Sequence, residues 1–155
     1  QPPFSDPLAF HLTWTTYGTW LPGDAPGWFD KHSGVCDSDP IREAAARRRM
    51  KEPPLTLSAE QRRIVEETVR DHCRHRGWHL HIVNPRTNHV HAVVTAKETS
   101  PRTAREQLKA WCTRRLKQTA GGRLRKNWWT EGGSTRIVDD DEQLEEAITY
   151  VRDAQ

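Results

Sequence analysis

Two histidines separated by one apolar residue occur at His89-Val90-His91, in a run that is otherwise apolar and β-branched. Such a run favours a β-strand, in which successive side chains point to opposite faces. His89 and His91 therefore share one face of the strand, and Val90 points to the other. Because two neighbouring imidazoles can ligate one metal ion, this spacing predicts part of a metal site.

A second pair with the same spacing, His79 and His81, lies on the preceding predicted strand. In a tight hairpin both histidine pairs can face the same side of the sheet. For either pair, the alternative to a metal site is an ordinary polar surface of the sheet. A structural zinc site built from all four histidines has no thiolate or carboxylate neighbour in the sequence to favour it. We favour His89 and His91 as the metal ligands. Their strand is the more apolar one, and polar side chains buried there are costly unless they have a binding partner.

Tyr150 is one of two tyrosines in the chain, the other being Tyr17. It lies beside the apolar stripe of a predicted C-terminal helix, formed by Leu144, Ala147, Ile148 and Val151. Its ring can pack at the edge of that stripe, or its hydroxyl can project over the sheet face that carries the histidines. A tyrosine hydroxyl has a pKa of about 10 and needs help to act as a nucleophile at neutral pH. A metal ion can give that help by polarising the group under attack.

Basic residues are concentrated between positions 102 and 126, where Glu106 is the only acid, although the net charge of the 155-residue chain is only +3. A solvated charged face is one interpretation, but this excess favours a surface that meets phosphate groups. The residues we expect to contact nucleic acid there are Lys109, Arg114, Arg115, Arg123, Arg125 and Lys126. Trp128 and Trp129 follow and can stack on unpaired bases, although core packing is favoured for at least one of them.

The predicted secondary structure alternates strands and helices. Strands are expected at 10–17, 78–83, 89–96 and 135–138, and helices at 59–75 and 101–119, with a last helix begun at Asp140 or Asp141. Ser58 and Gln61 have the spacing of a capping box at the start of helix 59–75. A turn is expected at 84–88, an irregular loop at 19–40 and a short helix at 41–51.

This order predicts an α+β fold in which helices pack on an antiparallel sheet. The length suits a single domain spanning 1–155, with an irregular insertion at about 19–56.

The three cysteines are widely spaced and match no zinc pattern, so we expect reduced thiols. With no apolar run long enough to cross a membrane and no signal-peptide pattern, we expect a cytoplasmic protein.

Five segments in this order resemble the HUH single-tyrosine transposases, especially the REP-associated tyrosine transposases with an IS200-like domain. The segments are His11–Asp24, Asn88–His91, Leu108-Lys109 with Thr113–Leu116, Trp128–Ser134, and Tyr150-Val151. The resemblance covers nearly the whole chain. The HUH pattern alone is weakly specific, whereas all five segments together are strongly specific.

The resemblance implies a ferredoxin-like or RRM-like sheet and an enzyme that nicks and rejoins single-stranded DNA beside a hairpin. Tyr150 corresponds to the nucleophile, which would form a 5′-phosphotyrosine intermediate, and His89 and His91 correspond to metal ligands. The metal is expected to be Mg²⁺ or Mn²⁺, because imidazole ligands suit Mn²⁺ better while Mg²⁺ is more abundant in cells. The DNA partner would carry palindromic hairpin ends, and the protein would be associated with the nucleoid.

Relatives of this kind supply a third ligand, Gln or Asn, about one helical turn after the nucleophile. Ala154 stands four residues after Tyr150 and cannot bind a metal, so we assign the third ligand to Gln155. Gln155 is five residues after Tyr150 and reaches the same side only if the helix loosens at its end. This departure supports an alternative function, a hairpin-binding protein that does not cut its nucleic acid. The resemblance leaves open whether the protein acts as a monomer or a homodimer.

Overall fold

Strand β1 (Ala9–Thr15) lies inside an antiparallel sheet whose strand order is β4-β5-β1-β6. Its partners are β4 (His79–Pro85), β5 (His89–Thr95) and β6 (Ser134–Val138). Three helices pack on the sheet: α2 (Ala59–Arg76), α3 (Pro101–Leu116) and α4 (Asp141–Arg152). The computed structural model describes residues 7–19, 28–30, 34–36, 41, 50–119 and 121–154. The predicted α+β fold with an antiparallel sheet is confirmed.

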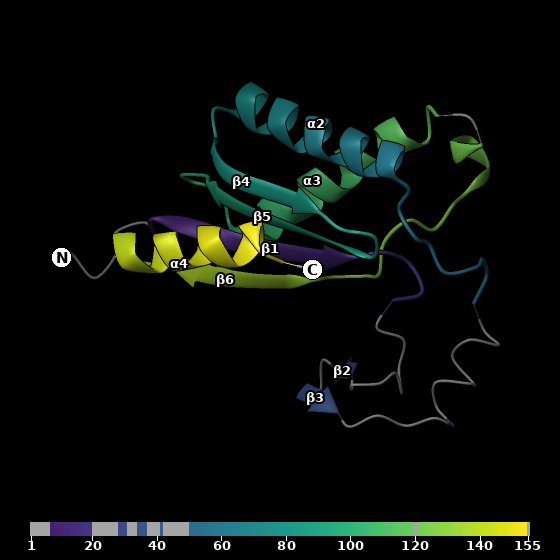
Figure 1. Ribbon diagram of the computed structural model, residues 1–155, viewed down its shortest axis with the longest axis horizontal. Coiled ribbons are helices and arrows are strands. Elements are labelled where there is room, and N and C mark those ends of the chain that lie inside the picture. Colours follow the sequence, from purple (N-terminus) through teal and green to yellow (C-terminus); the bar gives the residue numbers. More distant parts are fainter. Residues whose placement is uncertain are drawn as a thin grey trace.

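The helices cover opposite faces of the sheet, with α2 and α3 on one side and α4 on the other (Figure 1). Phe10, Leu12 and Trp14 of β1 point into the larger core under α2 and α3. Ala9 points the other way and packs with Val151 of α4 in a smaller cluster. Strand alternation thus divides β1 between two cores.

The smaller cluster under α4 covers only one end of its sheet face. It contains Ala9, Val93, Val138 and Val151, with Ile82, Leu144 and Ala147 at its margin. Further along the same face, the side chains are polar and not apolar: His11 and Thr13 on β1, and His91 on β5. The apolar contacts therefore hold α4 in place and leave a polar surface beside its C-terminal end.

Local sequence signals account for most helix ends. The Ser58 side chain accepts a hydrogen bond from the Gln61 backbone N–H at 3.1 Å, and the Gln61 side-chain oxygen accepts one from the Ser58 backbone N–H at 2.8 Å, which confirms the capping box. Helix α2 ends at Gly77, whose φ of 72° suits the left-handed cap. Asp140, and not Asp141, is the N-cap of α4.

The structure corrects three local predictions. Asn84 and Pro85, expected in a turn, pair with His91 and Val90 as the last residues of β4. Proline is tolerated there because β4 is an edge strand and the ladder needs no N–H from its outer side. Thr16 makes only an isolated bridge with Trp129, so β1 ends earlier than predicted. Strands β2 (Trp28–Asp30) and β3 (Gly34–Cys36) form an antiparallel pair in the segment predicted to be irregular.

The short predicted helix at 41–51 falls mostly on residues outside the described ranges. A 3₁₀ turn, η1 (Gly122–Leu124), follows α3. None of the helices in the described part of the chain combines the length and the apolar character that a bilayer-spanning segment requires.

Candidate active site

His89 and His91 lie on the same face of β5, with their ring centroids 4.8 Å apart. Val90 between them is fully buried on the opposite face. This is the arrangement that the His-Val-His spacing predicts. It is positioned by the pairing of β5 with β1, which sets His91 opposite Thr13 and His89 opposite Thr15.

The Nδ1 atom of each imidazole has a hydrogen-bond partner. Nδ1 of His89 donates to the side-chain oxygen of Asn88 at 2.7 Å. Nδ1 of His91 lies 3.0 Å from the Thr13 hydroxyl and 3.1 Å from Nε2 of His11. Partners at Nδ1 fix the ring and leave Nε2 for a ligand, as is usual for metal-binding histidines.

Both histidines are held in the neutral form that a metal ligand requires. Burial, together with the adjacent imidazoles of His89 and His11, lowers the pKa of His91 to about 4. Burial, with Arg86 nearby, lowers the pKa of His89. The pair therefore keeps its lone pairs at neutral pH.

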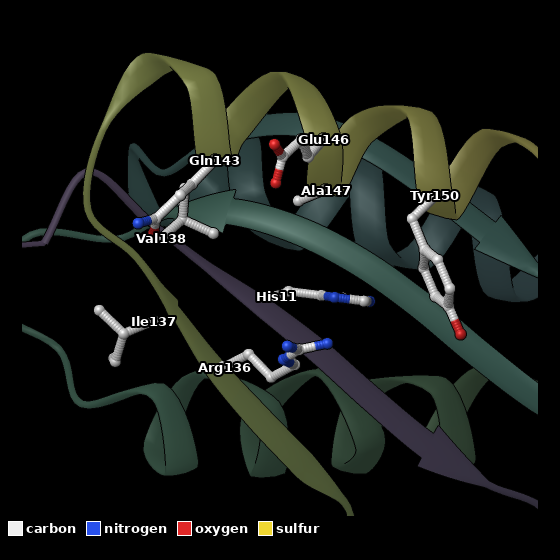
Figure 2. Close-up of a pocket in the computed structure, with 8 residues that line it drawn as sticks. All are labelled: His11, Arg136, Ile137, Val138, Gln143, Glu146, Ala147 and Tyr150. Atoms are coloured by element: carbon white, nitrogen blue, oxygen red, sulfur yellow. The ribbon is translucent and has the colours of Figure 1, made fainter.

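Tyr150 projects from α4 over this polar face. Its ring centroid lies 5.7 Å from those of both His11 and His91, with an edge-on approach in each case. Figure 2 shows the ring descending from the helix beside His11, with the hydroxyl directed away from α4. The side chain remains 60% exposed, so a large substrate can reach the hydroxyl.

The position of Tyr150 depends on its neighbour Val151. The Val151 side chain is fully buried in the small cluster under α4. Its carbonyl accepts a hydrogen bond of 2.7 Å from the Asn84 amide of β4. These two contacts hold the last turn of α4 against the sheet and thereby place the tyrosine.

His11, Thr13, Asn84 and Asn88 belong to the site but were not predicted as site residues. The alternation in β1 is the signal that could have found His11, because it separates His11 from the apolar face of Phe10, Leu12 and Trp14. Its proximity to His91, 80 residues later, has no local signal.

The third metal ligand proposed from the sequence, Gln155, lies outside the described residues. Helix α4 ends at Arg152, and Asp153 caps it and forms an ion pair with Arg152. Among the described residues, no group of three or more His, Cys, Asp or Glu side chains is arranged to hold a metal ion.

His79 and His81 form a separate pair, with ring centroids 4.4 Å apart. His79 pairs with Thr95, whereas the His91 position on the same hairpin pairs with Asn84. The two histidine pairs thus lie at opposite ends of the hairpin. A single zinc site from all four histidines does not form.

The basic residues of α3 lie on the face of the sheet opposite Tyr150, and several are already engaged. Lys109 is buried and donates to the carbonyls of Thr130 and Gly132. Arg115 forms an ion pair with Asp71 at 2.8 Å. Arg114 is exposed and stacks on the Trp111 ring, with its guanidinium carbon 4.4 Å from the centroid.

Among the basic and aromatic residues that follow α3, some side chains are likewise exposed and others are already engaged in contacts. Arg123 and Lys126 have exposed side chains, whereas Arg125 donates to the Asn127 and Pro53 carbonyls. Trp128 is buried in the core. Trp129 packs against that core and donates to the Thr113 hydroxyl at 2.9 Å.

Residues 49–154 match the model of the IS200-like transposase family. The chain belongs to this family. The match includes both histidines of the pair and Tyr150, and the resemblance found in the sequence is confirmed. No match was found among curated proteins.

Two solved structures share the fold of this IS200-like family member. One is a REP-associated tyrosine transposase bound to a REP hairpin, with a TM-score of 0.56 and 10% identity, covering 97% of this chain and 68% of that chain. The other, from Deinococcus radiodurans R1, is assigned as a transposase, with a TM-score of 0.53 and 16% identity, covering 98% of this chain and 94% of that one.

Proposed function

We propose that this protein is a metal-dependent enzyme that cuts and rejoins single-stranded DNA, with Tyr150 as its nucleophile. The observation that carries the proposal is the position of the Tyr150 ring, 5.7 Å from the ring of His91 on the face where His89 and His91 meet. A nucleophile beside a pair of neutral imidazoles suits metal-assisted transfer of a phosphoryl group. Membership of the IS200-like transposase family supports this choice of substrate.

His89 and His91, with Gln155 as the third ligand, would hold Mg²⁺ or Mn²⁺. The bound ion would polarise the scissile phosphate and offset the negative charge that develops on it. The chain itself supports this role through Asn88 and Thr13, whose side chains hold the two imidazoles at Nδ1.

In the proposed reaction, the Tyr150 oxygen attacks the phosphorus of one phosphodiester. A bond forms between that oxygen and phosphorus, and the bond from phosphorus to the 3′ oxygen breaks. The phenolic proton passes to solvent, to which Tyr150 is open, and the departing 3′ oxygen takes up a proton. Attack by a 3′-hydroxyl on the phosphotyrosine then rejoins DNA and restores the tyrosine, so no external energy source is needed.

The DNA would be a single strand with a hairpin, and the reaction would take place with the nucleoid in the cytoplasm. The solved relative bound to a REP hairpin supports this choice. We assign phosphate contacts to the exposed side chains of Arg114, Arg123 and Lys126, with Arg115 and Arg125 as secondary contacts. Lys109, Trp128 and Trp129 support this surface through their packing and hydrogen bonds.

The test is covalent capture of DNA. Single-stranded oligonucleotides carrying the palindromes that flank the gene are incubated with the protein and Mn²⁺, and the protein–DNA adduct is resolved under denaturing conditions. We expect an adduct that disappears in Tyr150→Phe, while hairpin binding remains. Tyr17→Phe is the matched control, because it removes the other phenolic hydroxyl of the chain. An adduct that persists in Tyr150→Phe would exclude Tyr150 as the nucleophile.

A non-cleaving hairpin-binding protein is the second candidate. It is favoured by Ala154, which cannot bind a metal, and by the described part of the chain, in which no three or more His, Cys, Asp or Glu side chains are arranged to hold a metal ion. This function predicts tight hairpin binding that a chelator does not change, with no adduct in Mg²⁺ or Mn²⁺.

A further inference from the structure

A cavity of about 460 Å³ opens beside Tyr150, on the side toward the N-terminal end of α4. His11 and Arg136 contribute to it from the sheet, and Gln143, Glu146 and Tyr150 from α4 (Figure 2). Its size is within the range of small-ligand sites. The proposed reaction needs Tyr150 and the histidine pair but assigns nothing to this cavity.

Arg136 supplies an available cation at the sheet side of the cavity. It lies on the edge strand β6 directly opposite His11, so both side chains point to the α4 face. In the described part of the chain it has neither a hydrogen-bond partner nor an ion-pair partner. Arginine binds phosphate oxygens with two parallel N–H groups, and the guanidinium here lies within the cavity that also contains Tyr150.

The α4 side of the cavity carries hydrogen-bonding groups of defined polarity. The Gln143 side-chain oxygen accepts from the Asp139 backbone at 3.0 Å, which leaves its NH₂ group as the free end. Glu146 presents a carboxylate, which accepts hydrogen bonds and does not donate them. A donor and an acceptor one helical turn apart match the edge of a nucleobase, which also carries both.

The apolar part of the lining on the α4 side comes from Val138 of β6 and Ala147 of α4. Their apolar groups, beside the polar ones, offer a flat base a small surface to pack against. The cavity therefore combines a cation, an apolar surface and a donor–acceptor pair. Those are the three interactions that an unpaired nucleotide uses.

We propose that this cavity binds the unpaired nucleotide next to the scissile phosphodiester, with Arg136 on a phosphate and with Gln143 and Glu146 on the base edge. The proposal rests on the proposed function, because it takes the phosphate attacked by Tyr150 as the anchor of the strand. The cavity then contributes to the choice of cleavage position, which a sequence-independent phosphate surface cannot make.

The test measures binding alone, in the Tyr150→Phe protein without added metal, so cleavage plays no part. The 155-residue, isotope-labelled protein is titrated with d(TpT), d(TpC), d(TpA) and d(TpG), and separately with inorganic phosphate and with deoxythymidine. The side-chain NMR signals of Arg136 and Gln143 are followed. We expect the dinucleotides to shift both signals in a saturable manner. Neither inorganic phosphate nor deoxythymidine is expected to shift both the Arg136 and the Gln143 signal.

Substitutions distinguish dinucleotide binding in this cavity from nonspecific attraction to positively charged side chains. Arg136→Ala is expected to weaken dinucleotide binding about tenfold or more, because it removes a charge-assisted pair of hydrogen bonds. Arg152→Ala is the matched control, since Arg152 is an exposed arginine of α4 outside the cavity lining, and is expected to leave binding unchanged. Glu146→Gln is expected to change the order of preference among the four dinucleotides.

Three results would overturn the proposal, whatever the outcome of the adduct assay. The first is the absence of shifts at Arg136 and Gln143 with every dinucleotide. The second is an equal loss of binding in Arg136→Ala and Arg152→Ala. The third is an equal response to inorganic phosphate, which would show an adventitious anion site only.

Discussion

Nε2 of His11 lies 3.1 Å from Nδ1 of His91, although the two residues are 80 positions apart in the chain. The contact forms because β1 and β5 are neighbours in the sheet and both side chains point toward α4. It connects a residue without a sequence-predicted role to the histidine pair. One ring must donate and the other accept, so the contact restricts the tautomer of His91.

His11→Phe tests this contact. Phenylalanine keeps a ring beside Tyr150 but has no nitrogen to hold Nδ1 of His91, so we expect the Mn²⁺ affinity to fall about tenfold. Calorimetric titration with Mn²⁺ measures the change. His75→Phe is the control, because His75 is an exposed histidine of α2. Unchanged Mn²⁺ affinity in His11→Phe would show that Thr13 alone orients His91.

Asn88→Ala tests the corresponding contact of the other ligand. The substitution removes the oxygen that accepts from Nδ1 of His89, so the ring can rotate and adopt the other tautomer. We expect a loss of about ten- to a hundredfold in Mn²⁺ affinity and a parallel loss in the rate of adduct formation. Thr87→Ala in the same turn serves as the control and should behave as wild type.

Asn84→Asp tests how α4 is anchored. Aspartate has nearly the same shape but at neutral pH places a carboxylate against the Val151 carbonyl, where the amide had donated. We expect the free energy of unfolding to fall by about 1–3 kcal/mol, measured by urea denaturation. Adduct formation should decrease more than hairpin binding, because the substitution displaces the helix that carries Tyr150. Equal decreases in both would indicate general unfolding instead.

Lys109→Met tests whether this lysine stabilises the fold. Its buried ammonium donates to the carbonyls of Thr130 and Gly132 at 3.1 and 2.9 Å. Methionine fills similar space and leaves both carbonyls without this donor, so we expect a loss of about 1–3 kcal/mol in the free energy of unfolding. Hairpin affinity at a temperature where the variant is folded should remain unchanged. Arg114→Ala should show the opposite pattern, with weaker binding and unchanged stability.

The stability of the metal-free protein should depend on pH through His91. Its folded-state pKa of about 4 lies below the ordinary value of 6.5, so the unfolded chain binds the proton more readily. The free energy of unfolding therefore keeps its full value with respect to His91 above pH 6.5, and it decreases as the pH falls from 6.5 toward 4. His11, His89 and Tyr150 are the titratable groups packed around the ring. Urea denaturation with a chelator should show a flatter pH dependence in His91→Gln than in wild type.

The local parts of the fold were predictable because each depends on residues close in sequence. The Ser58–Gln61 capping box begins α2, and Gly77 ends it with a left-handed backbone. The shared face of His89 and His91 follows from strand alternation alone. Asn84 and Pro85 were misassigned because residues that usually favour a turn are here held in an edge strand by pairing with His91 and Val90.

The basic helix shows where sequence reasoning stops. Charge density in residues 102–126 favours a phosphate-facing surface, but it cannot distinguish the exposed Arg114 from the buried Lys109. The difference arises from the carbonyls of Thr130 and Gly132, which reach Lys109 from the segment that leads into β6. Burial and hydrogen bonding by distant segments decide which charges remain available.

By itself the sequence determined the order of strands and helices, the common face of His89 and His91, and the placement of Tyr150 on the last helix, because these depend on short-range periodicity and capping. Only the tertiary structure decided that His11 meets His91, that Asn84 holds the turn carrying Tyr150, and that Arg136 and α4 enclose a cavity beside it. These contacts depend on strand order and register across segments far apart in the chain, and no local pattern encodes either.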